Sequence, residues 1–157
     1  MNQRTKRIWY ALLILLFLTL ALIWGHSAEA WEESHEKSLK IADAVSGFAI
    51  SLFGIEFDVE KLVRKGAHFG EFALLGCELA LLMLLRQRRS LQDLLNCLFC
   101  GLLAAVIDES IQVLSRRGSS LPDVLLDFSG VIAGTVLLFA VFDARSRRSA
   151  GSDGERG

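Results

Sequence analysis

The sequence predicts an all-α fold, a polytopic membrane bundle of four transmembrane helices. Hydrophobic residues make up 52% of the 157 residues and charged ones only 22%, and the charges collect in tails and links. The apolar residues form four long runs. Each run is close to the roughly 20 residues that a helix needs to cross a hydrocarbon core about 30 Å thick. Lipid offers backbone groups no hydrogen-bond partner, so such runs are expected to be helices. The predicted spans are residues 8–24, 67–85, 94–114 and 121–142.

The charged segments between the runs predict how the spans are oriented. Basic residues cluster before the first run, between the second and third runs, and after the fourth, at residues 4–7, 86–89 and 145–148. The link at residues 25–66 is instead rich in Glu and Asp. Excess Lys and Arg marks the cytoplasmic side of a membrane protein. We therefore expect a multi-pass protein of the bacterial cytoplasmic (inner) membrane with both termini in the cytoplasm.

The first run has a second interpretation. A basic tail, an apolar run and Ala28-Glu29-Ala30 together resemble a secretory signal peptide that is cleaved after Ala30. The apolar run, at 17 residues, is longer than the apolar core of most signal peptides, and it ends in Trp24, a residue typical of membrane interfaces. These features favour an uncleaved span. Cleavage would leave three spans and place the new N-terminus outside.

The link after the first run is too long for a simple turn. Apolar residues recur at roughly helical spacing over about residues 38–53, which predicts an amphipathic helix on the outer membrane surface. The alternative is a folded loop whose apolar side chains pack on the bundle. Ser46-Gly47 could break such a helix, so the sequence favours neither interpretation.

The fourth run begins with a proline and carries two glycines on one face. Pro122 falls in the first turn, where its missing N–H costs nothing. Gly130 and Gly134 form a G-x-x-x-G pair, which lets another helix approach closely. At about 100° per residue, these glycines share a face with Asp123 and Asp127. We expect this face to point into the bundle.

Ionisable residues inside three of the runs are expected to meet at one depth. An intramembrane charge costs at least about 2.5 kcal/mol on insertion scales, so such residues usually face a partner or a cavity. In the predicted topology they lie in the outer halves of the second, third and fourth spans, with basic residues flanking them. We predict a ligand-binding site in the outer leaflet, built from Arg64, Lys65, His68, Glu71, Asp108, Glu109, Gln112, Arg116, Arg117 and Asp123.

Each of these residues also has a purely structural interpretation. Asp123 follows Ser120 by three, a near match to a capping box, so it could serve only to start the fourth helix. His68 could be a neutral histidine that is hydrogen-bonded at the interface. The carboxylates of the second and third spans could pair with the flanking arginines and hold the bundle together. The constellation as a whole favours a site, because small and apolar residues stabilise a bundle at lower cost.

Two sequence blocks at these positions resemble the signatures of a known family. The first block is Arg64-Lys65-Gly-Ala-His68-Phe-Gly-Glu71-Phe72. The second is Asp108-Glu109-Ser-Ile-Gln112, followed by Arg117-Gly-Ser-Ser-Leu-Pro-Asp123 and Gly130. In this order they resemble the motifs of the VanZ-like family of bacterial membrane proteins. The chain departs from that pattern at Asp127, where the family usually has asparagine.

The resemblance implies a polytopic cell-envelope protein. A VanZ-like membrane domain would cover residues 1–144, with its motifs at 64–134, and residues 145–157 are expected to form a disordered cytoplasmic tail. The founding member is associated with resistance to the glycopeptide teicoplanin, so a link to glycopeptide susceptibility is one expectation. Most members lie outside resistance clusters, and this trait does not carry over by default.

Two functions of different classes follow from the predicted site. The first is a binding or accessory role for an anionic lipid, a polyprenyl-phosphate cell-wall intermediate or an envelope partner protein, with a homo-oligomer as a further option. The second is an intramembrane enzyme acting on a lipid phosphate or ester, with candidate residues His68, Glu71, Asp108 and Glu109. A nucleophile with an obvious base is missing, so the binding role is favoured. We expect no cofactor and no nucleic-acid partner. These four residues could also hold a divalent metal, but no spacing among them is diagnostic, and no metal site is assigned.

Overall fold

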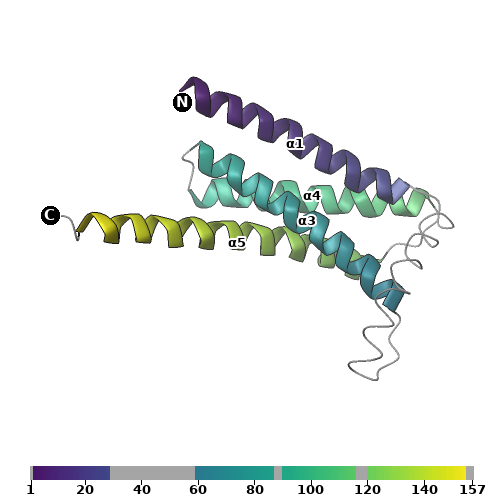
Figure 1. The fold of residues 1–157 in the computed structure, drawn as a ribbon. Helices are drawn as coiled ribbons and strands as arrows, with labels where there is room; N and C mark the ends of the chain where they lie inside the picture. Colours follow the sequence, from purple (N-terminus) through teal and green to yellow (C-terminus); the bar gives the residue numbers. More distant parts are fainter. Residues whose placement is uncertain (1, 29–58, 87–89, 116–119, 155–157) are drawn as a thin grey trace.

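The computed structural model describes residues 2–28, 59–86, 90–115 and 120–154, and within them every regular element is an α-helix (Figure 1). The helices are α1 (Gln3–Ala28), α3 (Val59–Leu85), α4 (Leu91–Leu114) and α5 (Leu121–Gly154). All four contain an apolar stretch long enough to cross a membrane. The predicted all-α fold with four spans is therefore confirmed, and each predicted span lies within an observed helix. The surface helix predicted at residues 38–53 lies outside the described residues.

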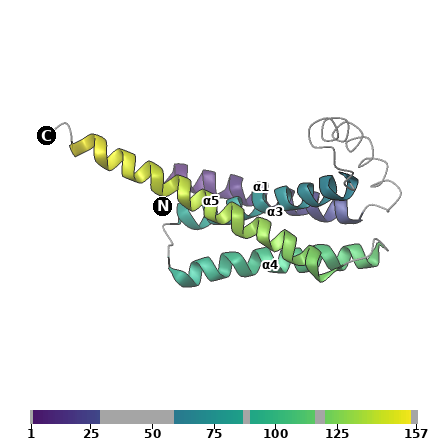
Figure 2. The ribbon, with the colours of Figure 1, turned by 90° about the horizontal axis from the view of Figure 1, so that it is seen from below.

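The four helices run alternately up and down the bundle. The start of α1 and the end of α5 lie at the same end, as Figure 1 shows. The opposite end is formed by the last turns of α1 and α4 and the first turns of α3 and α5; we call it the polar end. The most extensive helix contact is between α3 and α5, while α1 packs on α3 and α4. Figure 2 shows α5 running obliquely to α4, close to it at the start of α5 and away from it toward the C-terminus.

Glycines on both sides of the α3–α5 contact bring the two backbones together. A Cβ atom at Gly130 would lie 2.6 Å from the carbonyl oxygen of Phe69, and one at Gly134 would overlap the carbonyl group of Ala73. Gly76 of α3 meets the backbone of Val131 in the same way. Small residues allow this close approach without a clash. The contact sets how α5 is rotated against α3, and thereby where the side chains one turn away point.

The exterior of the bundle is apolar, as the lipid-facing surface of a membrane protein must be. On α1, for example, Phe17 is 67% exposed and Leu18 is 61% exposed. A small apolar core, which includes Ile23, Phe72 and Val131, fills the centre. Polar residues are buried beside it. Glu78 of α3 is 3% exposed and accepts a hydrogen bond of 2.9 Å from the Thr19 hydroxyl of α1.

At the end that carries the termini, polar contacts lie at the surface of the bundle. Ser90 and Asp93 form a capping box at the start of α4. The guanidinium group of Arg86 lies 4.3 Å from the centre of the Trp9 ring, a cation–π contact. Helix α5 continues to Gly154, so the segment expected to be a disordered tail is helical as far as that residue. A helix that is already nucleated extends at little cost, because each added residue gains a backbone hydrogen bond.

Candidate functional site

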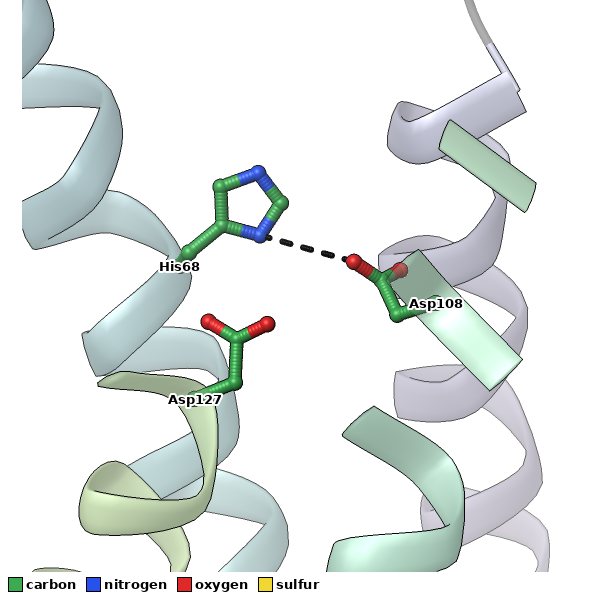
Figure 3. Close-up of side chains that lie close together, drawn as sticks. All are labelled: His68, Asp108 and Asp127. Atoms are coloured by element: carbon green, nitrogen blue, oxygen red, sulfur yellow. Dashed lines mark ion pairs between the residues drawn. The ribbon is translucent and has the colours of Figure 1, made fainter. Parts of the chain in front are cut away.

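The polar end brings together side chains from three helices. His68 comes from the second turn within the apolar part of α3, Asp108 from the last third of α4, and Asp127 from the second turn of α5. Their nitrogen and oxygen ligand atoms all lie within 4.8 Å of one another. Figure 3 shows the three side chains pointing toward a common space. We call this group the His68–Asp108–Asp127 cluster.

The two carboxylates of the cluster are buried. Asp108 is 0% exposed and Asp127 is 2% exposed. The Nδ1 atom of His68 lies 3.9 Å from Oδ2 of Asp108, an ion-pair distance if the imidazole is protonated (Figure 3). Burying a carboxylate in a low-dielectric interior costs free energy unless hydrogen bonds or opposite charges compensate for it. The surroundings of each oxygen atom therefore matter.

Among the described residues, the Asp108 carboxylate is hydrogen-bonded through one of its two oxygens. Its Oδ2 accepts a hydrogen bond of 2.8 Å from Nε2 of Gln112, one helical turn later on α4. Its Oδ1 is buried, and no hydrogen-bond donor among the described residues reaches it. The i, i+4 spacing of Asp108 and Gln112 places both on one face of the helix. The amide thus fixes the orientation of the carboxylate through Oδ2 alone, as far as the described residues show.

Glu109, next to Asp108 on α4, binds the backbone before α5 instead of joining the cluster. Its Oε1 accepts a hydrogen bond of 2.7 Å from the backbone N–H of Ser120, just before α5. This bond ties the start of α5 to α4. The other oxygen, Oε2, is buried, and no donor in the described part of the chain reaches it.

Asp123 joins the start of α5 to α3. The Lys65 ammonium lies 2.8 Å from Oδ1 of Asp123, and the Ser120 hydroxyl donates a hydrogen bond of 2.7 Å to Oδ2. The expected interaction between Ser120 and Asp123 is therefore present, but between their side chains. Asp123 serves both the helix start and an ion pair, so its two interpretations are compatible.

A small pocket opens beside the cluster. Its volume is about 40 Å³, which suits an ion, a few waters or the tip of a charged group and excludes a large ligand. Arg64 and Lys65 lie one turn before His68 on α3, closer to the end of the bundle, so basic residues stand above buried carboxylates. The pocket is lined by Arg64, Lys65, His68, Gln112, Asp123, Leu126 and Asp127.

Glu71, which the sequence places in the same site, contacts α1 instead. Its Oε1 lies 3.0 Å from Nδ1 of His26, and it does not line the pocket. The first turns of α3 thus present His68 to α4 and α5 and Glu71 to α1. Arg116 and Arg117 lie outside the described residues.

Asp127 is the residue that sequence reasoning left out of the site. It was recognised as lying on the inward face of the fourth span, but not as a ligand. Its spacing of three and four residues from Gly130 and Val131 is the signal that could have identified it. Because those residues pack against α3, a side chain one turn earlier on the same face must also point toward α3.

One of three comparisons with known proteins finds a match. A model of the VanZ/LLP1 family matches residues 9–142, a stretch that includes every residue of the His68–Asp108–Asp127 cluster. Neither the curated proteins nor the solved structures contain a match.

Proposed function

Because this chain belongs to the VanZ/LLP1 family and has four helices able to span a membrane, we propose that it is a cell-envelope protein that binds anionic phosphate headgroups at its polar end. The observation that carries the proposal is the pair Arg64 and Lys65 on the rim of a pocket that also contains an amide donor, Gln112. A guanidinium group binds phosphate through two parallel hydrogen bonds, and an ammonium group adds a point charge. The pocket is small, so only a phosphoryl group would enter, while the lipid chains stay in the bilayer.

The charge of the links supports an outward-facing polar end. The start of α1 carries the basic residues at 4–7, Arg86 follows the end of α3, and Arg145 lies in the last part of α5, all toward the end of the bundle that carries the termini. Under the positive-inside rule that end belongs in the cytoplasm and the polar end at the outer surface of the inner membrane. Basic residues such as Arg64 and Lys65 are disfavoured on the outer side, and an anionic ligand would offset that cost.

The orientation can be tested with single cysteines in a cysteine-free background. Cysteines at Ala28, near the polar end, and at Asp143, near the other end, are exposed at the surface of the bundle. In intact spheroplasts an impermeant thiol reagent should label Ala28→Cys and leave Asp143→Cys unlabelled until the membrane is opened. The reverse pattern would invert the topology.

Two sources could supply the phosphate: an acidic phospholipid or a polyprenyl-phosphate carrier of cell-wall synthesis. The second source would connect the protein to glycopeptide susceptibility. Native mass spectrometry of the full chain distinguishes them, using equal mixtures of phosphatidylcholine with either phosphatidylglycerol or a polyprenyl phosphate. We expect wild type to retain at least one anionic lipid after the zwitterionic one has dissociated.

Arg64→Gln and Lys65→Gln should each reduce retention of the anionic lipid several-fold. Arg86→Gln is the matched control, because it removes the same charge at the opposite end of the bundle, far from the pocket. Retention that is unchanged in Arg64→Gln would contradict the proposal. So would an equal loss in Arg86→Gln, because it would mean that general charge attracts the lipid.

An intramembrane enzyme acting on a lipid phosphate is the second candidate. The observation that favours it is the imidazole of His68, 3.9 Å from the buried carboxylate of Asp108 and beneath two basic residues. In such a hydrolysis His68 would accept a proton from water as the water attacks phosphorus, and would return it to the lipid oxygen as the phosphorus–oxygen bond breaks. Release of inorganic phosphate from a polyprenyl phosphate by wild type, abolished in His68→Gln, would support this candidate. Absence of turnover in wild type would reject it.

A further inference from the structure

The cluster beside the pocket has the composition of a metal site. We propose that His68, Asp108 and Asp127 bind one divalent transition-metal ion of the zinc or manganese kind. The three ligand groups come from three helices and converge within 4.8 Å. Such convergence of residues distant in sequence requires the whole bundle. One imidazole and two carboxylates leave further coordination positions open, as in metal sites that also bind water or a ligand.

The distances fit an ion with movement of side chains alone. Ligand atoms at about 2.1 Å around a tetrahedral Zn²⁺ ion lie roughly 3.4 Å apart. The cluster, with separations of at most 4.8 Å, therefore needs to contract by up to about 1.4 Å. Rotation about the side-chain bonds of His68 and Asp127 would supply a movement of this size.

A second observation points to a ligand in the same space. Asp108 is fully buried, its carboxylate points toward His68 and Asp127 in Figure 3, and no donor among the described residues reaches its Oδ1. A buried carboxylate oxygen without a partner is costly. A cation bound by both oxygens of the Asp108 carboxylate would satisfy Oδ1 and neutralise charge on both aspartates.

The neighbouring amide supports the same interpretation. Gln112 donates to Oδ2 of Asp108 and also lines the pocket. Ligand carboxylates in metal sites are commonly held by such outer hydrogen bonds, which fix their orientation. A mixed nitrogen and oxygen ligand set suits zinc and manganese, whereas calcium and magnesium prefer oxygen ligands alone.

The ion site is a separate inference from headgroup binding. Its ligands lie below Arg64 and Lys65, and the ion would bind whether or not a lipid occupies the rim. If both proposals hold, an open coordination position would face the phosphate group. The ion is therefore tested in nanodiscs of phosphatidylcholine alone, where no anionic lipid is present.

The experiment measures Mn²⁺ binding to the full chain by electron paramagnetic resonance after removal of any affinity tag. Wild type should bind one Mn²⁺ per chain, and Zn²⁺ should displace it. Asp108→Asn, Asp127→Asn and His68→Gln should each weaken binding at least tenfold. Glu71→Gln is the matched control, because it removes a carboxylate at the same end that faces His26; its affinity should equal that of wild type.

A readout on wild type keeps the test decisive if a variant fails to fold. Pulsed spectra of the bound Mn²⁺ should show coupling to an imidazole nitrogen, since His68 is a ligand. No saturable binding, or bound Mn²⁺ without nitrogen coupling, would overturn the proposal. Tight binding that persists in folded His68→Gln and Asp108→Asn would also overturn it, because the ion would then be elsewhere.

Discussion

At the end of the bundle that carries the termini, charged side chains lie at the surface: Arg86 covers the ring of Trp9, and Asp93 caps its own helix at Ser90. At the polar end, carboxylates from α4 and α5 are almost fully buried and face a histidine from α3. The first arrangement costs little because water solvates each charge. The second is costly without a partner. The costly buried charges at the polar end therefore indicate a functional site more strongly than the exposed charges at the other end do.

The largest loss of stability is expected at the glycines that let α5 approach α3 closely. Gly134→Leu would place a side chain against the backbone of Ala73, which cannot move without separating α5 from α3. Overpacking a well-packed contact costs about 1–3 kcal/mol, and a clash with backbone costs more. The yield of monodisperse protein in detergent should fall several-fold, as measured by size-exclusion chromatography.

The control for this change is Leu137→Ala, at a position that is 61% exposed on the outer face of α5. Its yield should stay near that of wild type. An equal loss in both variants would mean that the α3–α5 contact does not depend on the glycines.

The second effect concerns Glu78, the buried carboxylate in the middle of the bundle. Thr19→Val removes the hydroxyl that donates to it. A buried polar group left without a partner costs about 1–3 kcal/mol. The melting temperature in detergent should therefore drop by several degrees.

Combining Thr19→Val with Glu78→Leu should restore most of that loss, because the double variant contains no stranded charge. If Thr19→Val has no effect on the melting temperature, the hydrogen bond contributes nothing measurable. Glu78 would then be a buried carboxylate that the bundle tolerates without help from Thr19.

The third prediction separates a site from structural pairing. In a chelating buffer, Asp108→Asn should raise the melting temperature by roughly 3 °C, the shift that about 1 kcal/mol produces in a chain of this size. The change removes one of two adjacent buried carboxylates and supplies an N–H group that can donate to Asp127. Thermal unfolding followed by circular dichroism measures the shift.

Glu109→Gln is the informative companion. Glu109 accepts a hydrogen bond from the backbone of Ser120, a contact that the amide oxygen of glutamine can keep, so its melting temperature should change less. A marked destabilisation by Asp108→Asn would show that its charge holds the bundle together, and the metal site would lose its main support.

The smallest effect is expected at the end with the termini. Arg86→Gln removes an exposed cation–π contact worth about 0.5–1 kcal/mol. Its melting temperature should lie within about 2 °C of wild type. A larger loss would mean that the exposed end contributes more to stability than its local contacts indicate.

Much of the fold could be predicted from run length and composition. The four spans lie within the observed helices because helix formation in lipid depends on local backbone hydrogen bonding and hydrophobicity. The continuation of α5 to Gly154 was not predicted, since composition alone does not show that an existing helix extends into a polar segment. Depth could also be predicted: His68, Asp108 and Asp123 were expected at one level, and they do lie at the polar end.

The sequence did not predict which side chains of different helices contact each other, because these contacts depend on the rotation of each helix about its own axis. That rotation is set by packing, above all by Gly130 and Gly134 against α3. It directs His68 toward Asp108 and Asp127, while Glu71, three residues later, reaches His26 on α1. Local composition and spacing thus determined which residue types form the site and at what depth in the bundle they lie. Which carboxylates share the histidine was decided by contacts between helices that are far apart along the chain.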